Sequence, residues 1–215
     1  MSLTLHFHPL SSFCQKVLIG LYELGLPFER HLVDLGDEAA RAAFLKLWPM
    51  GKFPVLRDEA RSRTIPESTI ILEYLDAHCA PAPRLIPADP TRALECRLQD
   101  RFYDWHVQLP MQRIVGDRLR AEGQRDPLGA EQARGQLRAA YGVAEAQLGE
   151  SGWAAGEAFS MADCAAAPAL FYANELVPFE EEHPRLRAYF ARLCARPSYA
   201  RVQEEARPYL AMFPG

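Results

Sequence analysis

Four prolines fall within the twelve residues CAPAPRLIPADP, at positions 79–90 of the chain. Proline has no backbone N–H and a fixed φ, so this stretch cannot form a regular helix or a central strand, and it is typical of a linker between domains. The segments on its two sides differ in kind, because strand-like and helical runs alternate before it and only helical periodicity follows it. We therefore predict an α/β domain at residues 1–79, a linker at 80–90 and an all-helical domain at 91–215.

The composition is that of a folded globular protein. Of 215 residues, 49% are hydrophobic and 24% are charged, and the net charge of −4 gives no attraction for nucleic acid or for an anionic membrane. The N-terminus lacks the basic and apolar regions of a signal peptide, and no apolar run approaches the ~20 residues of a membrane span, so we expect a cytoplasmic protein. The five cysteines are scattered without metal-ligand spacing, which favours a reducing compartment and no structural metal.

The first domain is predicted to contain four strands and three helices. Residues 3–7 alternate in polarity and stop at His8-Pro9, and residues 12–24 carry apolar side chains at helical spacing before Gly25 and Pro27. The other elements are strands at 28–35, 53–58 and 63–66 and helices at 37–48 and 67–79. A helix between the first two strands implies parallel pairing, and the short link before the last strand implies a hairpin. We therefore predict a mixed sheet in the order β-α-β-α-β-β-α.

The second domain is predicted to be helical throughout. Its segments are 91–121, 127–148, 160–176, 184–195 and 198–206. In the first segment, apolar side chains recur every three or four residues. They are Leu94, Leu98, Phe102, Trp105 and Leu109. This spacing predicts a helix face buried in the core or, alternatively, a wall of a substrate site, and Pro110 is expected to kink or end the helix.

Three short motifs have a physical interpretation of their own. In GKFP, Pro54 can begin a strand, where no N–H is needed, and on the residues alone a trans bond is the ordinary state. In PESTIILEYLD, Ser68 can cap a helix; alternatively, Glu67 can hold the ammonium of an α-amino acid whose carboxylate meets the helix N-terminus. In FSMADC, Ser160 and Asp163 form a capping box, with a structural role worth about 0.5 to 2 kcal/mol.

The order of these features resembles the soluble glutathione transferase superfamily over essentially the whole chain. The motifs that carry the resemblance are HPLSSFCQKV before the first helix, PMGKFPVL at the third strand, PESTIILEYLD at the third helix and FSMADCAAAPAL in the helical domain. The resemblance implies a thioredoxin-like first domain and an all-α second domain. It also implies a homodimer that uses glutathione as a co-substrate and needs neither a metal nor a nucleic acid or membrane partner.

The resemblance further implies where the substrates bind. It implies a cis peptide bond before Pro54, so that the backbone of Phe53 contacts glutathione, with Lys52 beside it. It also implies that Glu67 and Ser68 bind the γ-glutamyl end of glutathione. The electrophile pocket is the most variable part of such proteins. Our candidates for it flank the apolar face around Pro110: Tyr103, His106, Met111 and Arg113.

The residue that meets the glutathione thiol must be chosen among Ser11, Ser12 and Cys14. A serine nucleophile needs a base, and no G-x-S-x-G elbow is present, so a serine hydrolase is a poor fit; His6 and His8 are interpreted as ordinary side chains. Counted back from QKVLIGL, Ser11 matches the catalytic serine of Tau- and Zeta-like transferases, and Ser12 stands where many relatives have proline. Cys14 matches the second, partly buried cysteine of a C-x-x-C motif. The resemblance therefore implies that Ser11 donates a hydrogen bond to the thiolate.

Our leading hypothesis is a transferase that conjugates glutathione to a small hydrophobic electrophile, or uses it to isomerise one, as in detoxification. The isomerase version resembles the Zeta class, although the chain reads SSFCQKV where that class has SSCSWRV. One alternative is glutathione-dependent thiol–disulfide exchange through a reactive Cys14. Another is a non-catalytic interaction protein that keeps the fold as a scaffold.

Overall fold

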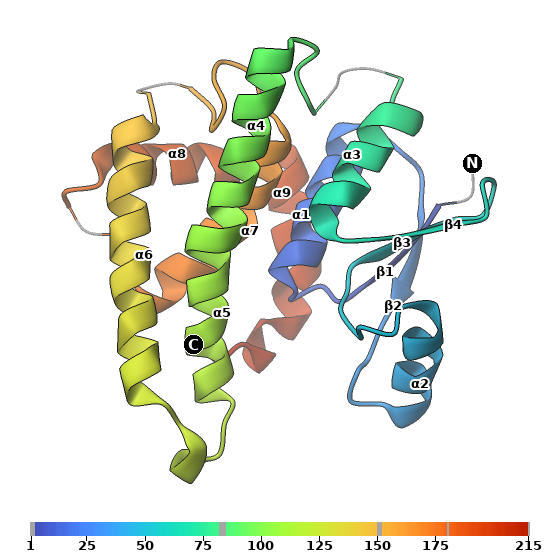
Figure 1. Ribbon diagram of the computed structural model, residues 1–215, viewed down its shortest axis with the longest axis horizontal. Coiled ribbons are helices and arrows are strands. Elements are labelled where there is room, and N and C mark those ends of the chain that lie inside the picture. Colours follow the sequence, from blue (N-terminus) through green and yellow to red (C-terminus); the bar gives the residue numbers. More distant parts are fainter. Residues whose placement is uncertain (1–2, 82–84, 150–151, 180, 215) are drawn as a thin grey trace.

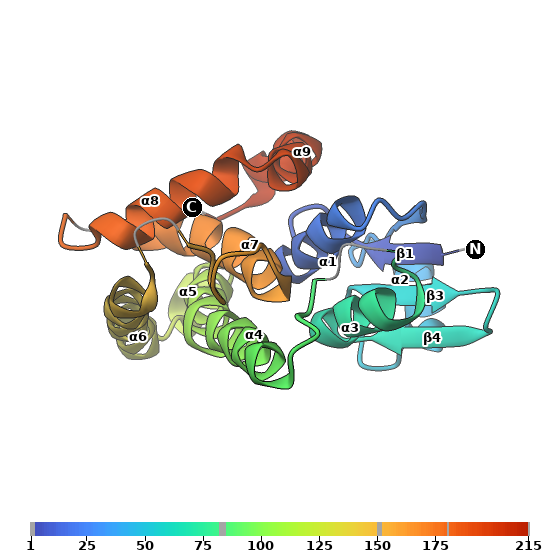
Figure 2. The same cartoon turned by 90° about the horizontal axis from the view of Figure 1, so that it is seen from above.

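The computed structural model describes residues 3–81, 85–149, 152–179 and 181–214. An α/β unit is followed by a helical unit, and the two lie side by side (Figures 1 and 2). The predicted linker at 80–90 falls partly on residues 82–84, which lie outside the described residues.

The α/β unit has the predicted order of elements. They are β1 (Leu3–Phe7), α1 (Ser12–Glu23), β2 (Glu29–Leu32), α2 (Glu38–Leu47), β3 (Val55–Asp58), β4 (Arg63–Pro66) and α3 (Ser68–His78). The sheet has the strand order β2-β1-β3-β4; β1 and β2 are parallel, and the other two pairs are antiparallel. The predicted mixed sheet and its hairpin are therefore confirmed.

Local sequence sets both ends of α1. Ser11 has an extended backbone, and its side chain accepts a hydrogen bond from the N–H of Cys14, as an N-cap does. At the other end, Gly25 has a φ of 63° and donates its N–H to the carbonyl of Tyr22. Glycine adopts this left-handed conformation without steric cost, so it ends the helix and turns the chain toward β2.

The remaining elements are all helical. They are α4 (Pro90–Phe102), the π-helix η1 (Tyr103–Gln108), α5 (Leu109–Arg118), the 3-10 turn η2 (Glu122–Gln124), α6 (Pro127–Gln147), α7 (Met161–Leu176), α8 (Pro184–Ala195), α9 (Pro197–Ala206) and the 3-10 helix η3 (Arg207–Met212). A proline stands in the first turn of α4, α6, α8 and α9. Its missing N–H has no partner there in any helix, so proline favours these starts.

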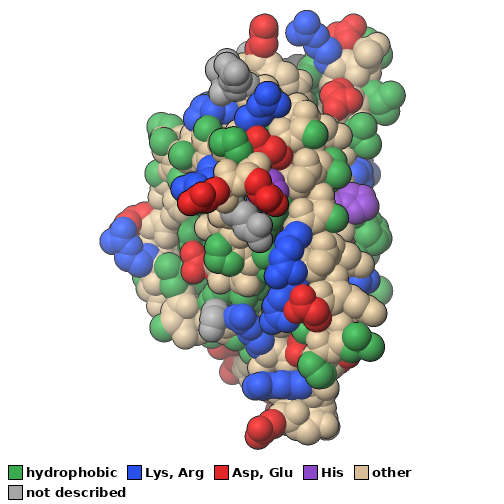
Figure 3. Space-filling view, turned by 90° about the vertical axis from the view of Figure 1, so that its left-hand side faces the viewer, with side chains coloured by type: hydrophobic (Ala, Val, Ile, Leu, Met, Phe, Trp, Pro, Cys, Tyr) green, Lys and Arg blue, Asp and Glu red, His purple; other side chains and the backbone are tan. Residues whose placement is uncertain are grey.

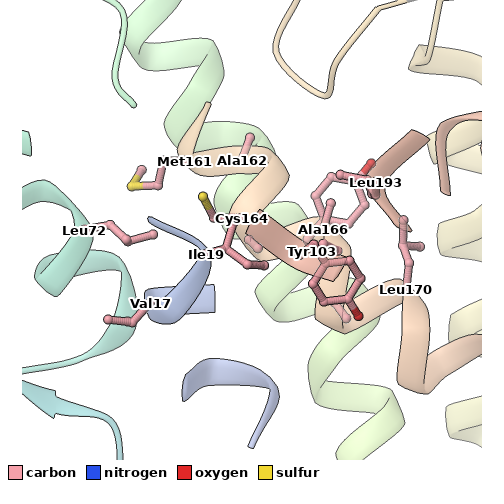
Figure 4. Close-up of a cluster of buried hydrophobic side chains, with 14 of the residues drawn as sticks. Val17, Ile19, Leu72, Tyr103, Met161, Ala162, Cys164, Ala166, Leu170 and Leu193 are labelled. Carbon is pink, nitrogen blue, oxygen red and sulfur yellow. The ribbon is translucent and has the colours of Figure 1, made fainter. Parts of the chain in front are cut away.

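Helix α1 joins the two units through a shared core. It packs against α3 in its own unit and against α7 and α9 of the helical unit. Figure 4 shows Val17 and Ile19 of α1 with Leu72 of α3 on one side and Cys164 of α7 close by. The buried cluster that contains them continues through the helical unit. Because α1 contacts both units, its first turn is held from two sides.

The predicted capping box at the start of α7 is confirmed. The side chain of Asp163 accepts from the N–H of Ser160, and the side chain of Ser160 accepts from the backbone N–H of Asp163. Asp163 also accepts from the N–H of Ala154 at 2.8 Å and from the hydroxyl of Tyr189 at 2.6 Å. Although burial raises the pKa of Asp163, these donors satisfy its oxygens, and the carboxyl group ties α7 to α8 and to the loop before it.

The predicted buried stripe at the start of the helical unit is wrong. Leu94, Leu98 and Trp105 are 68%, 56% and 59% exposed. The opposite face is buried, and it carries Asp100 and Asp104. Those two carboxylates pair with a buried lysine of α1, so the face that carries them turns inward together with Cys96 and Tyr103, and the face of Leu94 and Leu98 turns outward.

The disturbance predicted at Pro110 takes the form of a π-helix. Residues Tyr103–Gln108 form it, and the helix then continues as α5 from Leu109. The hydrogen bonds of a π-helix join residues five apart, and such turns occur where the regular ladder is interrupted. Pro110 has no N–H to donate to that ladder, so the wider turn before it lets the helix pass through the proline.

The outer face of the helical unit, on the side of α6, mixes charged and hydrophobic side chains (Figure 3). Figure 3 shows basic and acidic side chains interspersed on it, and on α6 Glu131 pairs with Arg134 and Arg138, both at 3.4 Å. No helix in the described part of the chain is long and apolar enough to cross a membrane. The same residues contain no group of three or more His, Cys, Asp or Glu side chains that could hold a metal ion.

Candidate functional site

Three strand ends and two helix starts meet at one edge of the sheet. His6 of β1 pairs with Val55 of β3, and Val55 pairs with Pro66 of β4. β1 therefore ends, β3 begins and β4 ends at the same edge. Helices α1 and α3 begin just after β1 and β4. The topology thus brings the start of α1, the start of β3 and the start of α3 to one place.

The hydroxyl of Ser11 lies at this edge. Its Oγ accepts a hydrogen bond from the N–H of Cys14 at 3.4 Å, and its own N–H donates to the carbonyl oxygen of His8 at 3.0 Å. A serine hydroxyl has one hydrogen besides its two lone pairs, so capping the helix leaves the O–H able to donate. Ser11 is also partly exposed. It can therefore stabilise an anion placed at the N-terminus of α1.

The two neighbouring candidates are already engaged or inert. Ser12 is 6% exposed, and its Oγ accepts a hydrogen bond from Nε2 of Gln108 in the π-helix. Cys14 is fully buried, and burial raises the pKa of its thiol to about 12. Such a thiol is not ionised near neutral pH and does not act as a nucleophile. Ser11 is therefore the one of the three whose side chain can meet a ligand.

The start of β3 lies beside the end of β1. The peptide bond between Phe53 and Pro54 is cis, as the resemblance predicts. The ring of Phe53 stacks on that of His8 with centroids 6.1 Å apart, and Lys52 is exposed in the loop before it. Tyr209 of η3 also contacts His8, with ring centroids 5.4 Å apart. Burial lowers the pKa of His8, so the ring stays neutral near pH 7 at the meeting point of the sheet edge and the C-terminal segment.

The turn into α3 differs from the prediction in one detail. Glu67, not Ser68, occupies the N-cap, with a φ of 69°, and Ser68 is the first helical residue. That φ is uncommon for a residue with a side chain, and such residues cluster at binding sites. No side chain caps the helix, so the N–H groups of its first turn keep their capacity to bind an anion. Glu67 therefore offers an exposed carboxylate to a cation, and the helix that begins at Ser68 offers its N–H groups to an anion.

A buried ion cluster lies behind this turn. Lys16 of α1 is 1% exposed, and its Nζ lies 2.6 Å from Asp100 Oδ1 and 2.9 Å from Asp104 Oδ2. It also donates to the hydroxyl of Thr69 at 2.9 Å. The cluster therefore ties α1, the first turn of α3 and the helical unit together. Sequence reasoning missed it, although a lysine among the apolar positions of a helix was a signal that a buried carboxylate had to be present.

Comparison with known proteins agrees with this geometry. Residues 5–83 match the model of the glutathione S-transferase N-terminal domain, and residues 102–197 match that of the C-terminal domain. The chain is 31% identical to glutathione S-transferase 3 of Zea mays, with 93% of this chain and 92% of that protein covered. This chain belongs to the glutathione S-transferase family.

Two further relatives show the range of the family. The structure of a glutathione S-transferase from Methylobacillus flagellatus with glutathione bound is 27% identical, with a TM-score of 0.84 over 93% of this chain and 98% of that one. FtsZ-localized protein A of Caulobacter vibrioides is 30% identical, with 97% of this chain and 93% of that protein covered. The glutathione S-transferase fold thus occurs here among relatives named as enzymes and one named for its place on FtsZ.

The four residues predicted for the electrophile pocket of this family do not come together. Tyr103 and Met111 are 1% and 3% exposed, within the core. His106 and Arg113 are exposed and line a cavity of about 490 Å³ between the η1–α5 segment and α6. His106 and Met111 are five residues apart, a spacing that places two side chains on different faces of a helix, and the π-helix shifts their rotation further, so the sequence alone did not resolve their faces.

A different cavity lies one helical turn from Ser11. Gln15, four residues later on the same face of α1, lines a cavity of about 380 Å³ together with Tyr172 of α7 and Leu210 of η3. Its Nε2 donates to the hydroxyl of Tyr172 at 2.9 Å, but its Oε1 has no hydrogen-bond partner in the described part of the chain. A bound donor would relieve that buried oxygen. Sequence reasoning missed these residues because they come from elements far apart in the chain.

Proposed function

We propose that this protein is a glutathione transferase in which Ser11 donates a hydrogen bond to the glutathione thiolate. The observation that carries the proposal is the N-cap geometry of Ser11, whose oxygen accepts from the helix, since a hydroxyl that accepts in this way also has a hydrogen that it can donate. The thiolate then attacks a small hydrophobic electrophile or assists its isomerisation. A cytoplasmic location and a role in detoxification remain predictions from the sequence.

Glutathione has a γ-glutamyl end that carries one ammonium and one carboxylate. We assign the ammonium to the carboxylate of Glu67, and the ligand's carboxylate to the Ser68 hydroxyl and the open N–H groups of α3. The backbone at the Phe53–Pro54 bond, with Lys52 beside it, is assigned to the middle of the tripeptide. The Lys16 cluster supports this assignment, because it holds Thr69, the residue after Ser68.

The contribution of Ser11 has a predictable size. A hydrogen bond to a charged group is worth ~1.5 to 3 kcal/mol and a helix N-terminus ~0.3 to 1, which together lower a thiol pKa by roughly two units. From a pKa of ~8.5, that raises the ionised fraction at pH 7 from about 3% to about 75%. The lower pKa also makes the thiolate a weaker nucleophile, and this loss of some 6- to 10-fold in rate offsets part of the gain in ionised thiol. Most of the acceleration must therefore come from holding the electrophile next to the sulfur.

We place the electrophile in the cavity that Gln15, Tyr172 and Leu210 line. The cavity begins one turn from Ser11 and has aromatic walls, which suit a small hydrophobic molecule. The unpartnered Oε1 of Gln15 favours a substrate that carries a hydroxyl or N–H group.

We also propose that the protein is a homodimer that pairs through the exposed face of α4 and η1. Leu94, Leu98 and Trp105 lie exposed on that face. Contiguous apolar patches of this kind mark interaction sites on soluble proteins. The cavity between η1–α5 and α6 opens on the same helices, so we assign His106 and Arg113 to this interface and not to the electrophile.

A second candidate function is that of a non-catalytic interaction protein. The 30% identity to FtsZ-localized protein A supports it. Thiol–disulfide exchange through Cys14 is disfavoured by the burial of that thiol and its high pKa. Glutathione affinity discriminates between a transferase and a scaffold that has lost its ligand.

The test is calorimetric titration of glutathione into the wild type and into Glu67→Gln and Ser68→Ala variants. Each substitution removes a partner of a charged ligand group, so each should weaken binding by ~1 to 3 kcal/mol. The control Glu38→Gln, which removes an exposed carboxylate from the first turn of α2, should leave the affinity unchanged. No binding to the wild type would favour the scaffold, and equal affinities for all variants would remove this site assignment.

A further inference from the structure

A second pocket lies at the far end of α1, away from Ser11. It has a volume of about 390 Å³ and is formed by the last turn of α1, the chain leading into β2, and α9. Figure 2 shows α9 beside α1 in this part of the molecule. Since α1 rises ~1.5 Å per residue, the pocket is roughly 15 Å from the residues proposed to bind glutathione. A ligand there would not compete with glutathione.

The floor of this pocket is apolar and partly aromatic. Leu21 and Leu26 are buried beneath it, and Pro27 and Phe28 form its wall. The ring of Phe28 lies 5.9 Å from that of Tyr22, centroid to centroid. The pocket is therefore of a size and lining that suit a flat aromatic molecule of one or two rings.

Two arginines stand at the rim. The guanidinium of Arg201 lies 4.0 Å above the ring of Tyr22, and only its Nε is bonded, to Glu205 at 3.1 Å. Arg30 donates from a single nitrogen, Nη2, to Tyr22 at 2.9 Å and to Glu205. In the described part of the chain, the other nitrogens of both guanidinium groups have no hydrogen-bond partner.

The charges at the rim do not cancel. Glu205 is the carboxylate that both arginines share, so two positive groups face one negative group. Burial and the neighbouring Glu205 raise the pKa of Tyr22 to about 12, and its hydroxyl stays neutral at pH 7. The rim therefore keeps one uncompensated positive charge directly above an apolar floor.

We propose that this pocket binds a small aromatic carboxylate. The rings of the ligand lie on Leu26 and Phe28, and its carboxylate accepts hydrogen bonds from the free nitrogens of Arg30 and Arg201, a pairing that guanidinium groups favour. The site is separate from the glutathione site and does not depend on the proposed transferase activity.

The test uses 2-naphthoate as the probe on the full chain in saturating glutathione. Binding is followed by calorimetry and by the NMR shift of the Gly25 amide, which lines the pocket. The matched neutral probe is naphthalene-2-carboxamide. The variants are Arg201→Gln and Glu205→Gln, with Arg138→Gln on α6 as the control for losing one paired, exposed arginine.

The two rim substitutions should act in opposite directions. Arg201→Gln should weaken 2-naphthoate binding about two- to fivefold, the range for a partly exposed ion pair, and Glu205→Gln should strengthen it by a similar factor. Arg138→Gln should have no effect, and the carboxamide should bind more weakly than the carboxylate. The proposal is overturned if the Gly25 amide does not shift, if the three variants bind alike, or if the carboxamide binds as tightly as the carboxylate.

Discussion

The start of α1 and the long helix formed by α4, η1 and α5 face each other, but their residues are placed in different ways. Ser11 is placed by a junction between two elements, where a strand has ended and a helix begins. Asp104 is placed by the rotation of one side chain about a continuous helix axis. Helix starts have recognisable residues such as serine and aspartate, whereas rotation about an axis depends on every turn before it. Function at a helix start is therefore easier to predict than function on a helix face.

The two regions contact each other along what we call the polar seam, formed by Ser12 and Lys16 of α1 and Asp100, Asp104 and Gln108 of the long helix. Ser12 accepts from Gln108, and Lys16 pairs with both aspartates. On each helix the members are four residues apart, so each set shares one face. The wider turn of the π-helix reduces the drift between Asp104 and Gln108 and keeps Gln108 on that face.

The largest effect is expected from removing the positive charge of the polar seam. Lys16→Met removes the buried cation that pairs with Asp100 and Asp104 and leaves only the half-exposed Arg101 beside them, which should cost up to ~3 to 5 kcal/mol of unfolding free energy. Chemical denaturation measures this loss, and Lys46→Met, at an exposed lysine of α2, is the control. Lys16→Arg keeps the charge and should lose less. If Lys16→Met costs no more than the control, the seam does not hold the two units together.

A smaller effect is expected at the other end of the seam. Gln108→Leu leaves the buried Ser12 hydroxyl without its donor, which should cost ~1 to 3 kcal/mol of stability. The pKa of the thiol of bound glutathione should not change, because Ser11 is oriented by its hydrogen bond from the N–H of Cys14 and not by Ser12. The exposed Gln112→Leu is the control for the loss of an amide. A large rise in the thiol pKa in Gln108→Leu would mean that the two regions are not independent.

The smallest effect on folding is expected from a substitution on the outward face of the long helix. Leu98→Gln should change monomer stability by less than about 0.5 kcal/mol, because the side chain is 56% exposed. It should nevertheless weaken the proposed dimer measurably in sedimentation equilibrium. Leu128→Gln, at a 71% exposed leucine of α6, should weaken it less. Equal dimer dissociation constants for the two variants would place the interface elsewhere.

Much of the fold followed from the sequence because its signals are local. Strands β1 and β4 and the capping box of α7 were predicted to the residue, since alternation, proline and the S-x-x-D pattern act over a few positions. The buried stripe at Leu94 and Leu98 failed because hydrophobic spacing shows that two faces differ but not which one is covered. The covered face is the one whose carboxylates pair with Lys16, more than seventy residues earlier in the chain.

The candidate site divides in the same way. Ser11, Pro54 and Glu67 lie at chain turns, and the topology of the sheet brings those turns to one edge. Gln15 and Tyr172 line a cavity together although 157 residues separate them, so no local sequence pattern predicts this cavity. The same reasoning explains why the predicted set of Tyr103, His106, Met111 and Arg113 did not converge.

The assignment of the thiolate to Ser11 is the central claim, and it is tested by ultraviolet titration of enzyme-bound glutathione in Ser11→Ala, Ser11→Thr and Cys14→Ala. Ser11→Ala should raise the pKa of the bound thiol by about one to two units, because the lost hydrogen bond stabilised the anion. Conjugation of an aryl halide should slow near pH 7 and partly recover at higher pH, where the thiol ionises unaided. Ser11→Thr keeps a hydroxyl and should restore most of the shift, and Cys14→Ala should leave the thiol pKa unchanged because that side chain is buried. An unchanged thiol pKa in Ser11→Ala, together with loss of activity in Cys14→Ala, would contradict the account and assign the chemistry to the cysteine.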